Sequence, residues 1–213
     1  MQPDLFTDTH GRHMLDPGAV VLSGFALKEA NALIGCIHTF CAASPFRQME
    51  TRGGHRMSVA MSNCGKLGWV SDRTGYRYDA VDPYTGRPWP AMPPLFADLA
   101  TRAAQAAGFA FYAPDACLIN RYIPGTKLSL HQDMDERDQL APIVSVSLGL
   151  PAIFLWGGKT RGSPKQRIDL HHGDVTVWGG PSRMVFHGVA PLKDGQHQAT
   201  GRLRYNLTFR KAA

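Results

Sequence analysis

With 213 residues, 44% hydrophobic and 19% charged, the chain has the composition of a globular protein with one full core, which excludes disordered and fibrous classes. Its net charge of +6 favours an anionic partner, and its four cysteines form no C-x-x-C pair that would indicate a zinc knuckle. No apolar run approaches the roughly 20 residues that span a bilayer, and residues 1–4 lack a signal-peptide pattern, so we expect a reduced, cytoplasmic chain without membrane contact.

The chain begins with an expected arm and helix. Residues 1–18 are polar and interrupted by Pro and Gly, so we expect a loose arm there. Residues 27–43 carry apolar side chains at intervals of three and four, which predicts an amphipathic helix. A second helix is predicted over residues 94–107, because Pro94 suits its first turn and Gly108 its C-terminal cap.

The middle stretch, residues 47–90, interleaves basic and aromatic side chains. It holds seven Lys and Arg against four acids, and its aromatic residues include Trp69, Tyr76, Tyr78, Tyr84 and Trp89. Nucleic acids offer phosphates to cations and bases to flat faces, so this composition fits nucleic-acid binding. A glycine-rich surface hairpin whose aromatic residues pack on the body fits it equally well.

From residue 116 onward the sequence changes to short strand-like runs separated by turn signals. They cover residues 117–122, 127–131, 143–148, 152–156, 167–171, 175–178, 184–187 and 203–209. About eight such strands predict an antiparallel double-stranded β-helix, or jelly roll, with helices packed outside one sheet. The fold class is therefore mainly β with flanking helices (α+β), in a single domain over residues 1–213.

A His-x-Asp tripeptide closes one of these strands. In an extended segment, residues i and i+2 point the same way, so His131 and Asp133 can bind one ion. The tripeptide alone is weak, since a second one occurs at His172-Gly173-Asp174.

Three features favour the first tripeptide. It ends a strand, whereas Gly173 marks a turn that Asp174 is expected to cap. A further histidine, His187, lies far enough beyond Asp133 to come from the opposing sheet. It follows Asp174 so closely that a metal site shared with Asp174 would be harder to build. Alone, His187 would be interpreted as a core histidine. With His131 and Asp133 it forms the set that leaves three positions open on Fe(II) in non-haem oxygenases.

The last predicted strand has a polar face of unusual composition. Its residues Arg204, Asn206, Thr208 and Arg210 alternate with Tyr205, Leu207 and Phe209. A solvated outer face is the ordinary interpretation, but two arginines without an acid are unusual there. If the polar face points inward, the guanidinium groups need anions, which a dicarboxylate would supply. Asn120 and Tyr122 could add hydrogen bonds from a neighbouring strand.

Together these residues resemble the AlkB family of Fe(II)/2-oxoglutarate dioxygenases, and most closely its bacterial members. The likeness runs from about residue 44 to residue 210. It rests on Asn120-Arg121-Tyr122, residues 131–136, residues 142–151 and Arg204-x-Asn206-x-Thr208-x-Arg210. The last pattern is the most specific to the family.

The resemblance implies which residues bind Fe(II), 2-oxoglutarate and O2. Fe(II) would bind to His131, Asp133 and His187. The distal carboxylate of 2-oxoglutarate would bind to Arg204, Asn206 and Tyr122. Its metal-proximal end would lie at Arg210 and Asn120, although the assignment of the two arginines to the two carboxylates stays open.

The resemblance also implies substrate contacts. Residues 47–90 would be a nucleotide-recognition lid between an N-terminal arm and helix (1–46) and a helix plus jelly-roll core (91–213). In the substrate complex, Trp69 would stack on the extruded base, Tyr76 contact a phosphate, Asp135 face the exocyclic amine and Arg161 line the pocket. Alternatively, Trp69 packs the lid, and Asp135 and Glu136 form a solvated acidic turn.

The implied function is oxidative demethylation of bases such as 1-methyladenine and 3-methylcytosine in single- or double-stranded DNA, and in RNA, by a monomer. The reaction would release formaldehyde, succinate and CO2. Met134 departs from the basic residue we expect in related bacterial sequences, a change expected to weaken strand binding modestly. Two alternatives stay open, namely an oxygenase acting on a protein or small molecule, and a non-enzymatic metal-binding jelly roll.

Overall fold

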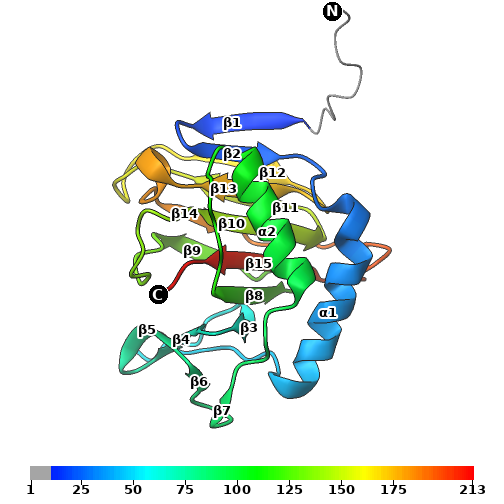
Figure 1. The fold of residues 1–213 in the computed structure, drawn as a ribbon, viewed down its shortest axis with the longest axis vertical. Helices are drawn as coiled ribbons and strands as arrows, with labels where there is room; N and C mark the ends of the chain where they lie inside the picture. The colour runs from blue at the N-terminus through cyan, green and yellow to red at the C-terminus, as the bar shows by residue number, and fades with distance from the viewer. Residues whose placement is uncertain (1–10) are drawn as a thin grey trace, which may run out of the picture.

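Two antiparallel sheets form the body of the protein in the computed structural model, which describes residues 11–213 (Figure 1). The larger sheet has the order β1 (Arg12–Asp16), β2 (Ala19–Leu22), β13 (Val175–Trp178), β10 (Ile143–Gly149), β15 (Arg204–Arg210), β8 (Ala116–Tyr122) and β3 (Ala60–Gly65). The smaller sheet has the order β12 (Gln166–Leu170), β11 (Ala152–Trp156), β14 (His187–Val189) and β9 (Leu128–His131). This is the predicted jelly roll, and it also confirms the mainly β fold class with flanking helices.

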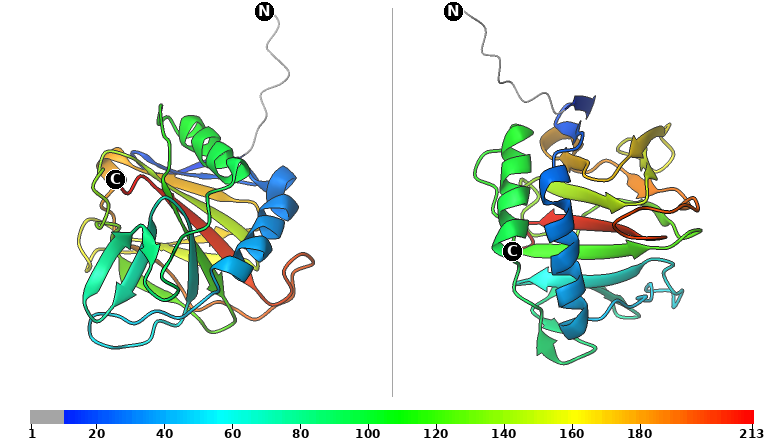
Figure 2. Two further views of the ribbon diagram at one scale, coloured as in Figure 1. Left: turned by 60° about the horizontal axis from the view of Figure 1, so that its bottom comes forward. Right: turned by 90° about the vertical axis from the view of Figure 1, so that its right-hand side faces the viewer.

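Two helices, α1 (Ala30–Ala43) and α2 (Pro94–Ala106), cover the outer face of the larger sheet (Figures 1 and 2). Both match the predicted helices, and α1 is preceded by a short 3-10 turn, Leu27–Glu29. A second 3-10 turn spans Gly180–Ser182. Neither α1 nor α2 is long and apolar enough to cross a membrane.

The alternation along β15 divides the protein into two cores. Tyr205, Leu207 and Phe209 pack with the helices on the outer face. The polar residues of β15 therefore point the other way, between the two sheets, as the inward-facing hypothesis requires. A second apolar cluster, which includes Phe154 and Trp156 of the smaller sheet, surrounds the polar side chains on that inner face.

The expected loose arm is wrong for residues 11–18. Residues 12–16 form β1, which pairs with β2. The run Ala19–Leu22 is buried and pairs with β13, so it extends the sheet by two strands that periodicity alone did not indicate. Residues 1–10 of the expected arm lie outside the described residues.

Seven of the eight predicted strands have the expected boundaries to within one residue. The exception is the run at 184–187. The strand there begins only at His187, because Phe186 donates its N–H to Gly158 outside the ladder.

Residues 47–90 contribute the edge strand β3 and two hairpins at one end of the molecule; in Figure 1 the first hairpin lies beside β3 and the second below it. The hairpins are β4 (Gly68–Asp72) with β5 (Gly75–Asp79), and β6 (Val81–Asp82) with β7 (Arg87–Pro88). A Cβ atom at Gly68 would come within 2.3 Å of the Trp89 ring. Glycine at this position therefore allows the first hairpin to pack on Trp89.

Candidate active site

A cavity of about 390 Å³ lies between the two sheets and opens beside the β4–β5 hairpin. All twelve predicted site residues line it: Trp69, Tyr76, Asn120, Tyr122, His131, Asp133, Asp135, Arg161, His187, Arg204, Asn206 and Arg210. Residues from widely separated parts of the chain thus converge on one space.

The His131–Asp133–His187 cluster has the geometry of a metal site. Their potential ligand atoms all lie within 4.8 Å of one another. His131 ends β9 and is the direct cross-strand partner of His187 on β14, with ring centroids 4.4 Å apart. The expectation that His187 comes from the opposing sheet is therefore wrong. Both histidines belong to the smaller sheet because β9 and β14 are neighbours.

Backbone carbonyls orient the two imidazoles. His131 Nδ1 lies 2.8 Å from the Ser129 carbonyl oxygen, and His187 Nδ1 lies 3.0 Å from that of Val185. A carbonyl can only accept, so each Nδ1 carries a proton, and in the neutral form of each ring the lone pair lies on Nε2. Burial and then the nearby His131 lower the pKa of His187 to about 4, so this ring is neutral at pH 7.

Asp133 is held as a carboxylate. Burial is the largest single influence and would raise its pKa, but the charge of Arg210, with smaller contributions from the two histidines and Arg183, holds the pKa well below its usual range. Arg210 Nη2 donates to Asp133 Oδ1 at 2.9 Å. The other oxygen, Oδ2, is buried without a hydrogen-bond partner and lies 3.7 Å from His187 Nε2. That oxygen and the two Nε2 atoms have free lone pairs, so they are the atoms that could coordinate a cation.

The donor set fits Fe(II). Two imidazoles and one carboxylate leave three coordination positions open, whereas a structural zinc site is normally closed by four ligands. Among residues 11–213, the metal-ligating cluster contains three such side chains and no fourth.

Arg204 is a buried cation that lacks an acidic partner within the described residues. Its side chain is 1% exposed and donates through Nη2 to Ser147 Oγ at 3.0 Å. Its Nε and Nη1 have no hydrogen-bond partner. Burial of an uncompensated charge is costly, and it lowers the pKa of Arg204. A carboxylate placed against Nε and Nη1 would remove that cost, so the residues fit a dicarboxylate such as 2-oxoglutarate.

Neutral side chains beside Arg204 offer further hydrogen bonds. The Tyr122 ring lies 5.2 Å from the Arg204 guanidinium, and its buried hydroxyl has no partner. Burial raises the pKa of Tyr122 to about 12, so the hydroxyl remains a donor. Asn206 donates both amide hydrogens within the chain, to Ser145 Oγ at 2.8 Å and to the Val146 carbonyl oxygen at 3.1 Å. Its role in the observed geometry is to fix the neighbouring side chains.

The rival His-x-Asp tripeptide has the predicted structural role. Asp174 accepts hydrogen bonds from the backbone N–H groups of Gly24 at 2.8 Å and His171 at 2.7 Å. Gly173 has a φ of +87°, the left-handed turn conformation that glycine favours. Asp174 is thus a turn cap.

Aromatic residues of the β4–β5 hairpin form the cavity entrance. The rings of Trp69 and Tyr76 stack with a centroid distance of 5.7 Å and an interplanar angle of 13°. Trp69 Nε1 donates to Asp135 Oδ2 at 2.8 Å, which joins the hairpin to the segment after the metal-binding strand. One face of the indole is covered by Tyr76, so a base stacking on Trp69 would use the other face.

Arg161 and Met134 complete the entrance. Arg161 donates to the Leu130 carbonyl at 2.8 Å and lies over the Phe186 ring. Met134 is 62% exposed at the edge of the cavity. Both residues lie in loops that line the cavity, and neither belongs to the metal-binding cluster.

A buried ion-pair network behind the metal cluster was missed from the sequence. Glu136 accepts from Tyr78 at 2.6 Å and from Arg183 at 2.9 Å, and it forms an ion pair with Arg210 at 3.2 Å. Glu136 is buried, so a solvated acidic turn is wrong for this residue. Arg183 also donates to the Asp133 carbonyl.

The comparisons with known proteins agree with this geometry. Residues 18–210 match the model of the 2OG-Fe(II) oxygenase superfamily. The chain is 59% identical to alpha-ketoglutarate-dependent dioxygenase AlkB of Salmonella typhimurium over 99% of its length and 98% of that protein. It is also 59% identical to the Escherichia coli protein of the same name, over 98% of this chain and 97% of that one.

A solved structure gives the same result for the fold. The structure of OsALKBH1 superposes with a TM-score of 0.83 at 31% sequence identity, covering 94% of this chain and 99% of that chain. The sequence resemblance, the two-sheet architecture and the metal cluster therefore agree.

Proposed function

The chain belongs to the AlkB family of Fe(II)- and 2-oxoglutarate-dependent dioxygenases, and we propose that it demethylates N-alkylated nucleic-acid bases such as 1-methyladenine and 3-methylcytosine. We include single- and double-stranded DNA, and RNA, among its substrates. The proposed enzyme is a cytoplasmic monomer. Residues 47–90 act as its nucleotide-recognition lid.

In the proposed enzyme, His131, Asp133 and His187 hold Fe(II) through the free Nε2 and carboxylate atoms. When bound, iron, 2-oxoglutarate and O2 supply the oxidising chemistry that hydroxylates the methyl carbon, with release of succinate and CO2. The hydroxymethyl group then leaves as formaldehyde and restores the base. The chain itself positions the reactants, excludes water and binds anions.

Two arginines have different tasks in this proposal. Arg204 and the Tyr122 hydroxyl bind the distal carboxylate of 2-oxoglutarate, because their partnerless atoms lie together. Arg210 fixes the orientation of Asp133 through Oδ1 and leaves Oδ2 for the metal. With Asn120, it lies at the metal-proximal end of the co-substrate.

The cavity entrance suits a cationic, unpaired base. Methylation at N1 of adenine or N3 of cytosine makes the ring cationic and blocks Watson–Crick pairing, so such a base costs less to extrude. The free face of Trp69 attracts a cation, and Asp135 lies at its indole edge. Tyr76 is exposed and available to a backbone phosphate, and Arg161 limits the entrance.

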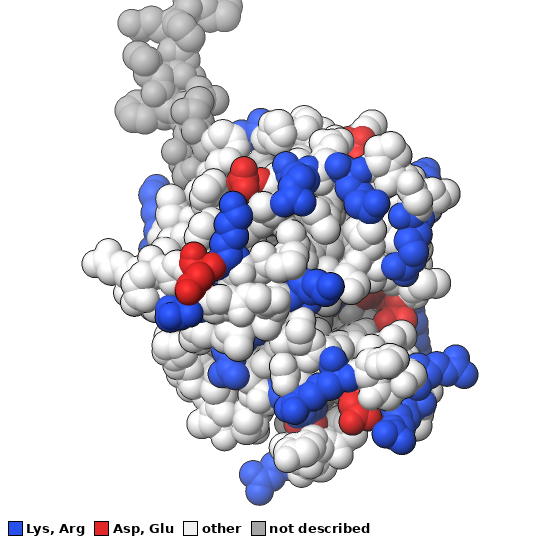
Figure 3. Space-filling model, turned by 180° about the vertical axis from the view of Figure 1, so that it is seen from behind, with Lys and Arg blue, Asp and Glu red and all other residues white. Residues whose placement is uncertain are grey.

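Surface charge supports a polyanionic substrate. The face turned away from the two helices carries far more Lys and Arg than Asp and Glu side chains (Figure 3). Such a face attracts phosphates over the distance of a few nucleotides.

The observation that carries the proposal is the joining of Trp69 to Asp135 beside the metal cluster in one cavity. The test incubates the protein with Fe(II), 2-oxoglutarate, ascorbate and an oligonucleotide that contains 3-methylcytosine. We expect the oligonucleotide to lose the mass of one CH2 group. If 2-oxoglutarate is consumed and the oligonucleotide mass stays constant, base demethylation is wrong.

A non-enzymatic zinc-binding jelly roll predicts a different spectroscopic result. Anaerobic addition of Fe(II) and 2-oxoglutarate to the proposed enzyme should produce a weak visible charge-transfer band. Tight retention of zinc without that band would favour the non-enzymatic alternative.

A further inference from the structure

A second groove lies behind the active-site cavity, at the β3 edge of the larger sheet. It has a volume of about 560 Å³, and its lining includes Arg47, Arg56 and Arg121 but no Asp or Glu. Arg47 is neutralised by a two-pronged ion pair with Asp82, in which Nη1 lies 2.8 Å from Oδ2. Arg56 and Arg121 have no ion-pair partner within residues 11–213. Two guanidinium charges therefore face this groove without a counterion from the described chain.

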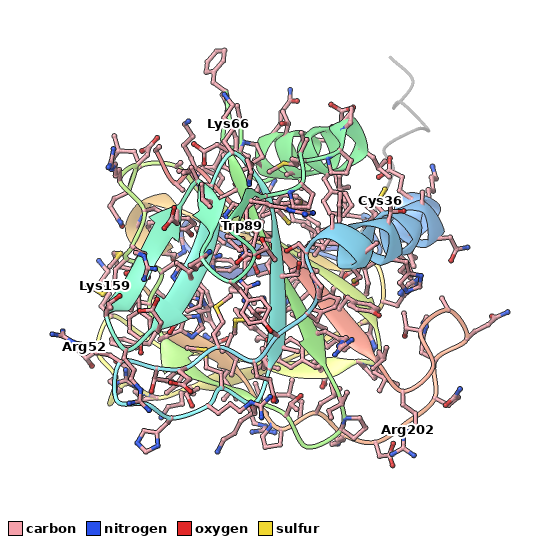
Figure 4. The ribbon with its side chains drawn as sticks, turned by 90° about the horizontal axis from the view of Figure 1, so that it is seen from below. Cys36, Arg52, Lys66, Trp89, Lys159 and Arg202 are labelled. Carbon is pink, nitrogen blue, oxygen red and sulfur yellow. The ribbon has the colours of Figure 1, made fainter. Side chains whose placement is uncertain are left out.

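Flat groups accompany these charges. The Arg121 guanidinium lies over the Phe46 ring, 4.7 Å from its centroid, and this contact orients the guanidinium group. Arg47 lies 5.5 Å from the Tyr84 centroid and 5.4 Å from that of Trp89, which Figure 4 shows near the centre of this end of the molecule. Tyr84 is 80% exposed, so its ring is available for stacking.

The groove and the active-site cavity lie on opposite sides of one chain segment. Met57 and Met61 line the active-site cavity, whereas Arg56 and Ser58 line the groove. Successive side chains of this segment thus alternate between the two spaces, as they do in the strand β3 that it leads into. The two spaces are thus separated locally by residues 56–61.

The exposed cation Lys127 lies beside this dividing segment. Ser58 Oγ donates to the Lys127 carbonyl at 2.8 Å and accepts from the Lys127 N–H at 3.1 Å. Lys127 is exposed, and the next residue, Leu128, lines the active-site cavity. A chain of phosphates that leaves the cavity across residues 56–61 would pass Lys127 and then meet Arg56 and Arg121.

We propose that this groove binds the phosphodiester backbone of nucleotides that flank the extruded base on the same strand. The inference rests on the proposed function and deepens it by naming where the rest of the strand binds. Arg56 and Arg121 bind phosphates, and Tyr84 stacks on a base outside the active site. Since phosphates are common to DNA and RNA, the groove binds both.

The test compares the wild type with the double variant Arg56→Gln/Arg121→Gln in equilibrium binding of 3-methylcytosine oligonucleotides. Two lengths, about 4 and about 15 nucleotides, are used as DNA and as RNA. For the longer oligonucleotide we expect affinity at low salt to fall about tenfold, and the slope of log K against log salt to decrease in magnitude by about 1.4. Binding of the shorter one should change less than about twofold, because it ends before the groove.

Two control variants separate charge from folding and position. Arg202→Gln removes an exposed arginine that does not line the groove and lies at the edge of the view in Figure 4, and it should leave binding of both oligonucleotides unaffected. Arg56→Lys/Arg121→Lys keeps the charges and should keep the wild-type salt slope. Equal losses for both lengths, or an unchanged slope in the glutamine variant, would overturn the groove proposal. A failure of the proposed function would be distinguishable from a failure of the groove proposal. In that case the wild type would demethylate neither oligonucleotide, whatever the binding measurements show.

Discussion

The floor of the cavity, formed by His131, Asp133, His187, Arg204 and Arg210, contrasts with its entrance, formed by Trp69, Tyr76, Met134, Asp135 and Arg161. Apart from Asp133, the floor residues all lie within strands, and four of the five are buried. The entrance residues come from one hairpin and from loops, and Tyr76 is 48% exposed. The floor is thus fixed by sheet hydrogen bonds, whereas the entrance depends on side-chain contacts.

The two regions also differ in what their polar atoms bind. Partnerless buried atoms collect in the floor, on Asp133, Arg204 and Arg210. At the entrance, the Trp69 indole and Asp135 already satisfy each other. The floor therefore has polar atoms that only a bound ligand would pair. At the entrance, a substrate would replace contacts that the side chains already make with one another. The predictions below separate these two roles.

The largest effect is expected from a metal ligand in the floor. Asp133→Ala should lower the affinity for Co(II) or Fe(II), measured by anaerobic titration, by more than about 100-fold, which exceeds the usual loss from an outer-shell partner. The matched control is Asp174→Ala in the rival His-x-Asp tripeptide, which should keep wild-type metal affinity. Equal losses in the two variants would contradict the assignment of the metal site.

The next largest effect separates 2-oxoglutarate binding from metal binding. Arg204→Met should weaken 2-oxoglutarate binding about 10- to 100-fold, the loss expected for charged hydrogen bonds, and leave metal affinity unchanged. The same variant should unfold no earlier than wild type when 2-oxoglutarate is absent, because it removes an unpaired buried charge. Arg202→Met, at an exposed position nearby, serves as the control. A variant that loses stability without the ligand would show that the contacts of Arg204 with Ser147 and Tyr122 outweigh the cost of burying its charge.

At the entrance, the effect should be limited to the nucleic acid. Trp69→Ala removes stacking worth about 1–3 kcal/mol, so KM for a methylated oligonucleotide should rise about 5- to 100-fold. The dissociation constant of 2-oxoglutarate, measured by titration, should not change. Trp69→Phe keeps an aromatic face, so its KM for the methylated oligonucleotide should lie between those of the wild type and Trp69→Ala. If the alanine variant instead loses 2-oxoglutarate affinity, the entrance and floor are not separable.

The smallest effect is expected at exposed Met134. Met134→Lys adds one cation at the cavity edge, so it should tighten oligonucleotide binding about threefold at low salt and steepen the salt slope by about 0.7 for a single strand. Binding measured across a salt series checks this. Met134→Gln adds no charge and should leave the slope unchanged. A slope that stays constant in the lysine variant would mean that no phosphate passes this position.

The sequence predicted the local features of the floor because they are periodic, whereas the entrance residues were implied only by the family resemblance. The i, i+2 spacing of His131 and Asp133 and the alternation from Arg204 to Arg210 each follow from extended backbone. The helices were also predicted from local features, namely the apolar spacing of 27–43 and the terminal residues Pro94 and Gly108 of the second helix.

The features that were missed depend on pairing between distant segments. His187 was expected on the opposing sheet because spacing along the chain does not say which strands are neighbours. The Glu136–Arg183 ion pair joins two loops, and no periodicity connects them. Strand β1 was missed because its pairing with β2, rather than its own polar sequence, forms it.

The most direct test of a demethylase with a separate floor and entrance is the coupling of co-substrate turnover to the base. Succinate and formaldehyde are measured together with a 3-methylcytosine oligonucleotide and with its unmethylated counterpart. We predict that the methylated oligonucleotide accelerates succinate formation and yields one formaldehyde per succinate in wild type, whereas Trp69→Ala at the same concentration forms less of both. Equal succinate formation with the two oligonucleotides, without formaldehyde from either, would contradict the account.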